Sequence, residues 1–252
     1  MKTRKSGFVK SDAARLRRIE AILRETYGSP RHYNPTDPLE DLIFLVLSRM
    51  TQEIKYRRTY AALRESMPDW EIVRDAPPDE LEGLLSDAGL APTKTSQIQA
   101  ILKEIEQREG ALDLARLRTL EDADVEQYLT SLPGVGRKTA RCVMLYALGR
   151  RTCPVDTHVW RVMRRLGFAE DAAWSESRSR ELEETIPREL RSSLHVNLVA
   201  HGRATCTAVS PRCDSCVVRS NCPSRHQQRS AVRRARLPVR APVRSPHATL
   251  DR

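Results

Sequence analysis

Apolar residues recur at three- and four-residue spacings along most of this chain, which is the period of amphipathic α-helices. The first such stretch is predicted to begin after Ser11, a residue suited to a helix N-cap, and to end near Tyr27, before Gly28-Ser29-Pro30. Its apolar face consists of Leu16, Ile19, Ile22 and Leu23. Long alternations of β-branched residues are absent and aromatic residues make up only 5% of the chain, so the pattern predicts an all-α fold.

A second helix start is signalled by Thr36-Asp37-Pro38, where proline stands near the first helical position and the apolar run Leu42–Leu47 follows. From Ser224 onward the composition changes to Arg, Pro, Ala and Ser with little to bury, which predicts a disordered basic tail. Further helices are predicted near Lys55–Ser66, Trp70–Ala76, Pro78–Asp87, Lys94–Gly110, Leu112–Arg118, Asp124–Ser131, Arg137–Leu148, His158–Leu166, Ser175–Ile186 and Leu190–His201.

The bulk properties of the chain favour a soluble, cytoplasmic protein. Its 252 residues suffice for one large domain or two small ones. The net charge is +10, but basic residues gather in residues 1–10 and from residue 223 onward, so the body between them is close to neutral. No apolar stretch of the secretory type follows Met1–Lys10, and Leu42–Leu47 is too short to span a bilayer. We therefore expect no membrane partner.

Charge within the body is segregated along the sequence. Between Arg137 and Arg165, eight basic residues face a single acidic one, Asp156. Elsewhere acidic residues prevail, as in Asp75–Asp87 and Glu121–Glu126. This segregation favours a phosphate-binding face over a generally basic surface.

The segment Leu132–Ala140 predicts a turn between two helices, in which Gly134 and Gly136 flank the apolar Val135. Glycine permits positive φ and a close backbone approach, and Val135 can anchor the turn. The N–H groups of Gly134, Gly136 and the next helical turn then form an anion site suited to a DNA phosphate. Ordinary helix–helix turns also contain glycine and proline. The basic residues that follow favour binding of a nucleic-acid backbone without sequence specificity.

Lys138 is a candidate nucleophile in the first turn of the helix after this hairpin, where a lysine opposes the helix dipole. An amine nucleophile must be neutral, and at an unperturbed pKa of about 10.4 only about one molecule in a thousand is neutral near pH 7.4. Burial, the dipole and neighbouring arginines would each favour the neutral form. Contact with a phosphate is the alternative role.

Four cysteines near the C-terminus have the spacing C-x6-C-x2-C-x5-C, which indicates one metal site in a cytosolic protein. Zinc and an iron–sulfur cluster both accept four thiolates, and the spacing by itself leaves both open. The other two cysteines, Cys142 and Cys153, are expected to be packing residues. The predicted ligands are Cys206, Cys213, Cys216 and Cys222.

Together with these cysteines, Leu132–Ala140, Val155–Val162 and His201-Gly202-Arg203 closely resemble the endonuclease III family of helix-hairpin-helix DNA glycosylases. The resemblance covers roughly Thr36–Cys222 and implies an all-α, two-domain fold with a C-terminal [4Fe–4S] cluster loop. The implied divisions are 1–31, an N-terminal segment packing with the cluster domain; 32–150, a six-helix domain with the hairpin; 151–222, the cluster domain; and 223–252, the disordered basic tail.

The resemblance also implies roles for individual residues. Lys138 would attack the sugar C1′ of a flipped-out damaged nucleotide, expel the base and form a Schiff base, after which β-elimination nicks the strand. Asp156 would assist by stabilising positive charge on the sugar or by moving protons. It also precedes a predicted helix and fits an N-cap role. The DNA-binding residues implied by the hairpin are Gly134, Val135, Gly136, Arg137 and Thr139.

Two regions correspond to the residues with which the family fills the gap in the duplex, and both differ in part from the family pattern. Met50 stands where the family usually has a glutamine that fills the gap left by the flipped nucleotide. Methionine fills space by dispersion but cannot pair with the orphan base as an amide does. Leu90 matches the second, apolar wedge, whereas Ala91-Pro92 replaces the aromatic residue commonly found after it. Without the resemblance, Met50 and Leu90 would be interpreted as packing residues.

The predicted function is a bifunctional DNA glycosylase/AP lyase of base excision repair that acts as a monomer on oxidised pyrimidines and abasic sites in double-stranded DNA. One alternative is a damage-binding protein of the same fold with weak or no catalysis. Another is a MutY-like adenine glycosylase, which lacks the lysine and needs a glutamate where this chain has Phe44 or Leu45. The expected location is the cytoplasm, in association with the nucleoid if the source is bacterial.

Overall fold

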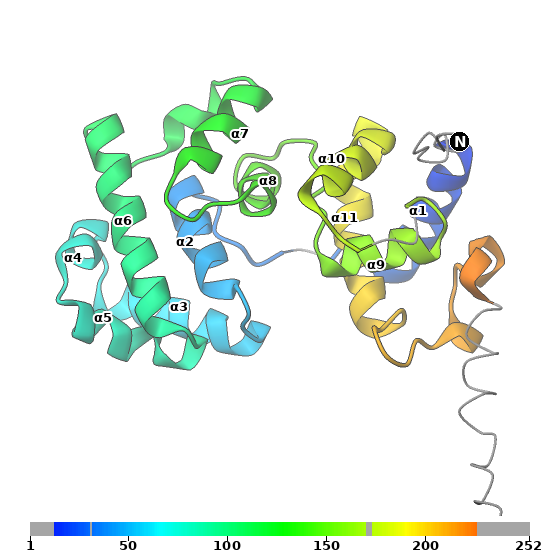
Figure 1. The fold of residues 1–252 in the computed structure, drawn as a ribbon, viewed down its shortest axis with the longest axis horizontal. Helices are drawn as coiled ribbons and strands as arrows, with labels where there is room; N and C mark the ends of the chain where they lie inside the picture. The colour runs from blue at the N-terminus through cyan, green and yellow to red at the C-terminus, as the bar shows by residue number, and fades with distance from the viewer. Residues whose placement is uncertain (1–12, 31, 170–172, 226–252) are drawn as a thin grey trace, which may run out of the picture.

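The computed structural model describes residues 13–30, 32–169 and 173–225, which form helices joined by loops, with no strand among them. The all-α prediction is therefore confirmed. Figure 1 shows two lobes side by side. The helices are α1 (Ala13–Tyr27), α2 (Pro38–Ser48), α3 (Glu53–Ser66), α4 (Trp70–Asp75), α5 (Pro78–Leu85), α6 (Ala91–Glu109), α7 (Asp122–Ser131), α8 (Arg137–Tyr146), α9 (Thr157–Arg165), α10 (Glu176–Thr185) and α11 (Arg191–Ala204).

Buried side chains form two separate cores, one in each lobe. The first lies within α2–α8 and includes Leu42, Val46 and Val143. The second joins α1 to α9–α11 and includes Leu16 and Leu198. The N-terminal helix α1 thus packs on α11, far from it in sequence (Figure 1). The chain crosses between the lobes before α2 and again between α8 and α9, so these two crossings bring residues of both lobes together.

Helix α2 begins as its sequence predicts. The Asp37 carboxylate accepts hydrogen bonds from the backbone N–H groups of Leu39 (2.9 Å) and Glu40 (3.0 Å), and Pro38 occupies the first helical position. Residues 38, 39 and 41–47 are all buried, because α3, α6 and α8 pack around this helix. None of the helices in the described ranges is both long and apolar enough to cross a membrane.

The helix predicted over Leu112–Arg118 is wrong, because only a 3₁₀ turn, Ala115–Arg118, forms there. The Asp113 side chain accepts a hydrogen bond from the N–H of Ala115 (2.7 Å), a local turn that competes with helix formation. The predicted N-cap Ser11 and most of the predicted tail, residues 226–252, lie outside the described residues.

Candidate active site

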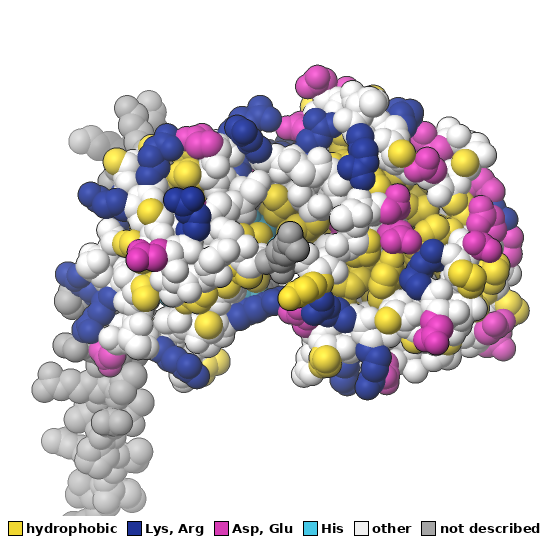
Figure 2. Space-filling model, turned by 180° about the vertical axis from the view of Figure 1, so that it is seen from behind, with side chains coloured by type: hydrophobic (Ala, Val, Ile, Leu, Met, Phe, Trp, Pro, Cys, Tyr) yellow, Lys and Arg dark blue, Asp and Glu magenta, His cyan; other side chains and the backbone are white. Residues whose placement is uncertain are grey.

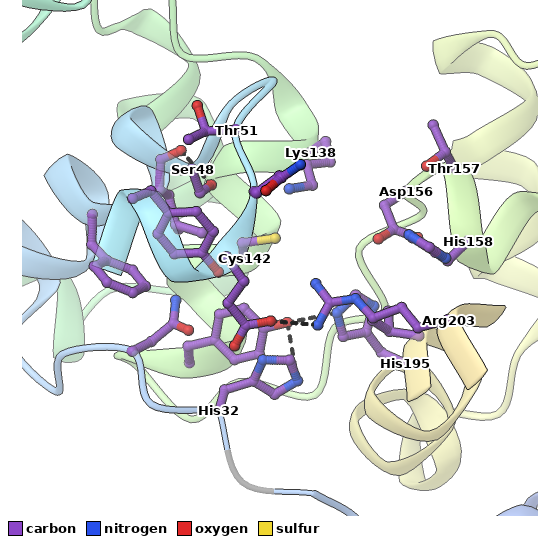
Figure 3. A pocket seen from close by; sticks show the side chains of 18 of the residues that line it. His32, Ser48, Thr51, Lys138, Cys142, Asp156, Thr157, His158, His195 and Arg203 are labelled. Carbon is purple, nitrogen blue, oxygen red and sulfur yellow. Dashed lines mark hydrogen bonds and ion pairs between the residues drawn. The ribbon is translucent and has the colours of Figure 1, made fainter. Parts of the chain in front are cut away.

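A pocket of about 500 Å³ opens between the two lobes, and both lobes supply its walls (Figure 3). Its polar lining is rich in hydrogen-bonding groups. The lining residues are His32, Asn34, Phe44, Leu45, Ser48, Met50, Thr51, Gln52, Glu53, Tyr56, Lys138, Cys142, Tyr146, Asp156, Thr157, His158, His195, Val199 and Arg203.

Lys138 is on the pocket face of α8. The helical period places Lys138, Cys142 and Tyr146 on the same face, one turn apart, and all three line the pocket. The Lys138 side chain remains exposed within the pocket. Its pKa is raised above the usual value, mainly by Cys142 and also by Asp156, although burial opposes this shift. The prediction that burial, dipole and arginines favour a neutral amine is therefore not supported, and Lys138 must lose a proton before it can attack.

Asp156 lines the other side of the pocket from Lys138 (Figure 3). It is the N-cap of α9, and its Oδ1 accepts a hydrogen bond from the N–H of Val159 (2.8 Å). The cap fixes the carboxylate at the pocket wall. Asp156 therefore caps the helix and lines the pocket at the same time. A nucleophilic amine needs a nearby base to take its proton, and the Asp156 carboxylate is such a group in the same pocket as Lys138.

A chain of polar rings that the sequence did not predict forms the pocket floor. His195 Nδ1 donates to the carbonyl of Pro154 (2.8 Å), and burial lowers the His195 pKa to about 4, so its Nε2 is an acceptor at neutral pH. The Tyr146 hydroxyl therefore donates to His195 Nε2 (2.7 Å). His32 stacks against Tyr146 with ring centroids 4.3 Å apart. Only Tyr146 carried a signal in the sequence, its helical register with Lys138.

An ion pair crosses the pocket between the lobes. Arg203 of α11 donates to Glu53 of α3 at 2.7 Å (Figure 3). Both side chains are partly exposed, so the pair is accessible and not part of either core. Both residues line the pocket, so the pair links the two lobes at the pocket wall.

The two predicted wedge residues both project from strained backbone. Met50 has φ 53° and is 93% exposed, and Leu90 has φ 54° and is 54% exposed. The left-handed conformation costs an ordinary residue roughly 1–2 kcal/mol, and an exposed apolar side chain gains nothing from water. Such strain at exposed apolar side chains indicates a role outside the folding of the chain itself.

The hairpin between α7 and α8 has the turn that its glycines predict. Gly134 has φ +66°, where any residue with a Cβ is strained, and a Cβ there would lie 2.7 Å from Nε2 of Gln97 and displace that side chain. Val135 is buried in the first core and anchors the turn. A Cβ at Gly136 would meet nothing within 4 Å. The backbone at Gly136 is therefore open to an external group, with Thr139 half-buried in the turn that follows.

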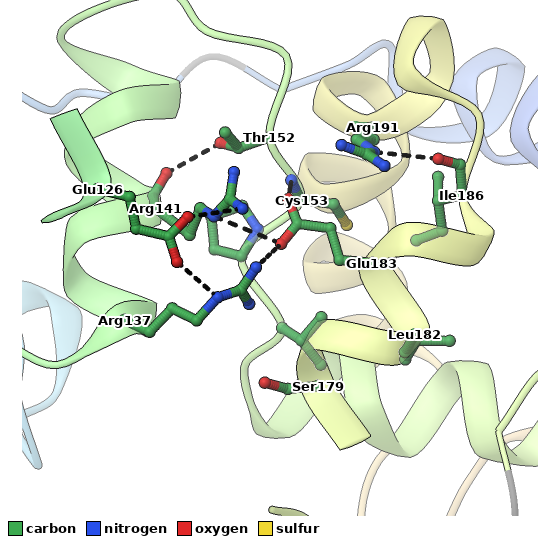
Figure 4. A network of polar contacts seen from close by, with 12 residues as sticks. Glu126, Arg137, Arg141, Thr152, Cys153, Ser179, Leu182, Glu183, Ile186 and Arg191 are labelled. Carbon is green, nitrogen blue, oxygen red and sulfur yellow. Dashed lines mark hydrogen bonds and ion pairs between the residues drawn. The ribbon is translucent and has the colours of Figure 1, made fainter. Parts of the chain in front are cut away.

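The side chain of Arg137 is not available for DNA, which corrects the expectation for this residue. It pairs with Glu126 of α7 (2.7 Å) and Glu183 of α10 (2.9 Å), and Arg141 pairs with Glu126 at 2.7 Å (Figure 4). Glu183 is 1% exposed and also accepts the N–H of Cys153 at 2.8 Å, in the crossing between the lobes. This buried network, Glu126–Arg137–Arg141–Glu183, joins the two lobes directly beside Lys138.

Other arginines of the predicted phosphate-binding face are likewise held by the protein. Arg150 pairs with Asp122, Arg161 donates to the carbonyls of Gly202 and Cys206, and Arg165 donates to the carbonyls of Thr207 and Ala208. The exposed charge is instead divided between the two lobes. Figure 2 shows acidic side chains along the outer edge of the α2–α8 lobe and mainly basic ones on the other lobe.

The four predicted metal ligands line one cavity beside α9 and α11. Arg165 Nη1 lies 3.3 Å from Cys206 Sγ, and His201 Nε2 lies 3.7 Å from Cys216 Sγ. Within the described ranges, no three His, Cys, Asp or Glu side chains are gathered tightly enough to hold a metal ion. Four thiols around one cavity nevertheless match the donor set of a cubane cluster, which separates its ligands more widely than a single ion does.

Comparison with known proteins identifies the family. The family model of the HhH-GPD superfamily base excision DNA repair protein matches residues 44–188, more than half of the chain. Endonuclease III of Escherichia coli K12 is 30% identical over 210 residues, which cover 82% of this chain and 94% of that protein. An Arabidopsis thaliana relative, named only provisionally as a DNA glycosylase, is 34% identical over 165 residues; these are 66% of this chain and 56% of that relative.

The solved structures agree with the sequence relatives. A trapped covalent intermediate of endonuclease III with DNA, in an estranged-adenine complex, matches with a TM-score of 0.72 and 30% identity, covering 86% of this chain and 98% of that one. The fold of this chain thus has a counterpart along nearly the whole of that chain. This chain therefore belongs to the HhH-GPD superfamily of base excision DNA repair proteins, as a DNA glycosylase of the endonuclease III type.

Proposed function

We propose that this glycosylase is bifunctional: it removes oxidised pyrimidines such as thymine glycol from double-stranded DNA and nicks the resulting abasic site. The observation that carries the proposal is the pairing of Lys138 with Asp156 across a pocket of about 500 Å³, which has room for a flipped-out base. The strained, exposed wedge residues Met50, which lines the pocket, and Leu90 support the same interpretation, since extrusion of a nucleotide leaves a gap in the duplex to be filled.

The reaction begins with loss of a proton from the Lys138 ammonium, for which Asp156 is the acceptor in the pocket. The amine nitrogen bonds to C1′ while the bond from C1′ to the base breaks, and the base leaves with a proton. Opening of the sugar ring gives an imine between C1′ and Lys138. Removal of a C2′ proton then expels the 3′ phosphate and cuts the strand. The covalent DNA intermediate of the related endonuclease III supports this route.

Duplex DNA is held through its backbone in this proposal. The N–H groups of the exposed Gly134 and Gly136 bind a phosphate, and the basic lobe adds attraction without sequence specificity. One chain supplies both pocket walls, so we propose that it acts as a monomer. We also propose damaged bases and abasic sites as its targets and the cytoplasm as its location.

We further propose a [4Fe–4S] cluster on Cys206, Cys213, Cys216 and Cys222. The four thiols around one cavity, with Arg165 and His201 beside two of the sulfurs, support it. A cluster with four protein ligands and no open coordination site supplies structural stability to the loop, and no step of the base-removal chemistry requires it.

The test uses duplexes that carry one thymine glycol, one abasic site, or adenine opposite 8-oxoguanine. We expect release of thymine glycol and a strand cut that leaves an unsaturated aldehyde at the 3′ end of the upstream fragment and a phosphate at the 5′ end of the downstream fragment. Preferred removal of adenine would instead indicate the adenine glycosylase. Tight binding of damaged duplex without turnover would indicate a non-catalytic damage-binding protein. This is the second candidate, because Met50 lacks the side-chain amide that the family usually has at this position.

A further inference from the structure

Lys94, in the first turn of α6, is a buried cation outside the pocket. It is 3% exposed, and its ammonium donates hydrogen bonds to the carbonyl of Leu47 (2.7 Å), the hydroxyl of Thr51 (2.8 Å) and the carbonyl of Ala88 (2.8 Å). All three of its N–H donors therefore have acceptors. Burying an ammonium is costly without such partners, so the three hydrogen bonds are what allow a charged lysine at this buried position.

The three acceptors belong to the two segments that carry the wedge residues. Leu47 is at the C-terminal end of α2, and Thr51 directly follows Met50. Ala88 ends the 3₁₀ turn η1 (Ser86–Ala88), two residues before Leu90. The Thr51 hydroxyl in turn donates to the Ala88 carbonyl, so the two segments are also linked to each other. The Leu47 and Ala88 carbonyls lie at the C-terminal ends of α2 and η1, where unsatisfied carbonyls concentrate negative charge and favour a cation.

The side chains of the wedge residues are too exposed to fix their own backbone conformation by packing. Met50 is almost fully exposed, and both Met50 and Leu90 have left-handed backbone that an unrestrained loop would relax. The restraint must therefore come from neighbouring backbone. Burial, and secondarily Arg49, lowers the pKa of Lys94 to about 8. At pH 7 roughly nine in ten molecules still carry the ammonium with its three donors.

We infer that Lys94 is a positioning residue for DNA: its ammonium fixes the Met50 and Leu90 segments in one arrangement, so that the gap in a damaged duplex is filled without ordering loops on binding. The inference rests on the proposed function of Met50 and Leu90. Preorganised loops avoid the entropic cost of ordering side chains on binding. Loss of Lys94 is therefore expected to weaken recognition of damaged duplex and to leave the Lys138 pocket chemically intact.

The experiment compares wild type with Lys94→Met, in which an apolar side chain of similar length replaces the ammonium. The matched control is Lys103→Met, an exposed lysine of the same helix. Affinity is measured for undamaged duplex and for duplex with a tetrahydrofuran abasic-site analogue. We expect Lys94→Met to lose roughly tenfold of the preference for the analogue and Lys103→Met to lose none. 2-Aminopurine placed opposite the analogue reports unstacking of the orphan base. Its fluorescence should change less on binding of Lys94→Met than on binding of wild type.

The second readout uses a gapped duplex, in which the partner strand lacks the nucleotide opposite the abasic-site analogue. The wedge residues then have no orphan nucleotide to displace. Lys94→Met should bind this gapped duplex as wild type does. A preference within twofold of wild type would overturn the inference, as would an equal loss on the gapped duplex. Should Lys94→Met fold poorly, Thr51→Val removes one acceptor and should lose part of the preference. Failure of the proposed function is separate, because it would appear as absent strand cutting by wild type.

Discussion

Lys94 and Lys138 are lysines in comparable helical positions with opposite surroundings. Lys94 is shut inside the protein with three acceptors for its three protons, whereas Lys138 is exposed in an open pocket that also contains Asp156. The pKa of Lys94 is lowered to about 8 and that of Lys138 is raised. A lowered pKa alone would thus select Lys94 as the nucleophile.

The comparison shows that space and partners decide the role of a lysine here. A nucleophile needs a substrate atom within reach and a group to take its proton. Lys138 has both, because α8 projects it into the interlobe pocket beside Asp156. Lys94 has neither, and its hydrogen bonds join two loops. The raised pKa of Lys138 makes its partner carboxylate more important to the reaction.

The largest expected effect follows replacement of Lys138 by glutamine, which keeps length and polarity but removes the amine. Cutting of abasic duplex should fall by at least about a thousandfold, as for other covalent catalysts that lose their nucleophile. Single-turnover incision measures the effect, and thermal melting should be unchanged because the side chain is exposed. Incision within tenfold of wild type would mean that the comparison assigns the wrong lysine.

Glu183→Gln tests the network on the neighbouring face of α8, where Arg137 directly precedes the nucleophile in sequence. Removing one carboxylate leaves Arg137 and Arg141 with Glu126 alone in a buried network, which should cost about 3–5 kcal/mol in free energy of unfolding. Urea denaturation measures this cost. The control Glu104→Gln breaks a more exposed pair with Arg108 and should cost only about 0.2–0.5 kcal/mol. Equal losses in the two variants would show that the network does not hold the lobes together.

Asp156→Asn separates capping from catalysis. Asparagine is as good an N-cap, so stability should hardly change, while incision should fall about a hundredfold with loss of the proton acceptor. Asp156 raises the pKa of Lys138, so its removal lowers that pKa, and the residual rate should level off at a lower pH than in wild type. Rates across neutral and alkaline pH measure both effects. A pH profile identical to wild type would place Asp156 outside the reaction.

Met50→Gln makes the smallest change, at the segment that Lys94 holds. An amide can pair with the orphan base, so affinity for damaged duplex should become dependent on the opposite base by about two- to fivefold, the worth of one modest hydrogen bond. Wild type should show no such dependence. Binding to duplexes with each of the four opposite bases checks it, and a strong preference in wild type would refute the apolar wedge.

Local signals in the sequence were sufficient for the caps and the hairpin. Asp37 and Asp156 each cap a helix through an N–H two or three residues away, and Gly134 is required by its own φ. The partners of Arg137 and Arg141 escaped prediction because both lie outside the basic segment: Glu126 is 11 residues before Arg137 and Glu183 is 46 residues after it. Counting charges in that segment therefore gave a phosphate-binding face where the fold has ion pairs.

The pocket could be predicted only in part for the same reason. Lys138 and Asp156 match motifs of the endonuclease III family, and Met50 stands at a position where the family usually has a glutamine, so all three could be named from the sequence. His32 and His195 come from segments more than a hundred residues apart, and only the packing of the lobes brings them together at Tyr146. The three acceptors of Lys94 are likewise brought together by tertiary structure alone.

The most direct measurement is borohydride reduction of the wild-type protein on abasic duplex, followed by mass spectrometry of the cross-linked peptide. Reduction converts a lysine imine into a stable bond to DNA, so it records which amine attacked. The adduct should lie on Lys138, with none on Lys94 and none at all in Lys138→Gln. An adduct on Lys94, or equal trapping by Lys138→Gln, would contradict the assignment of the two lysines.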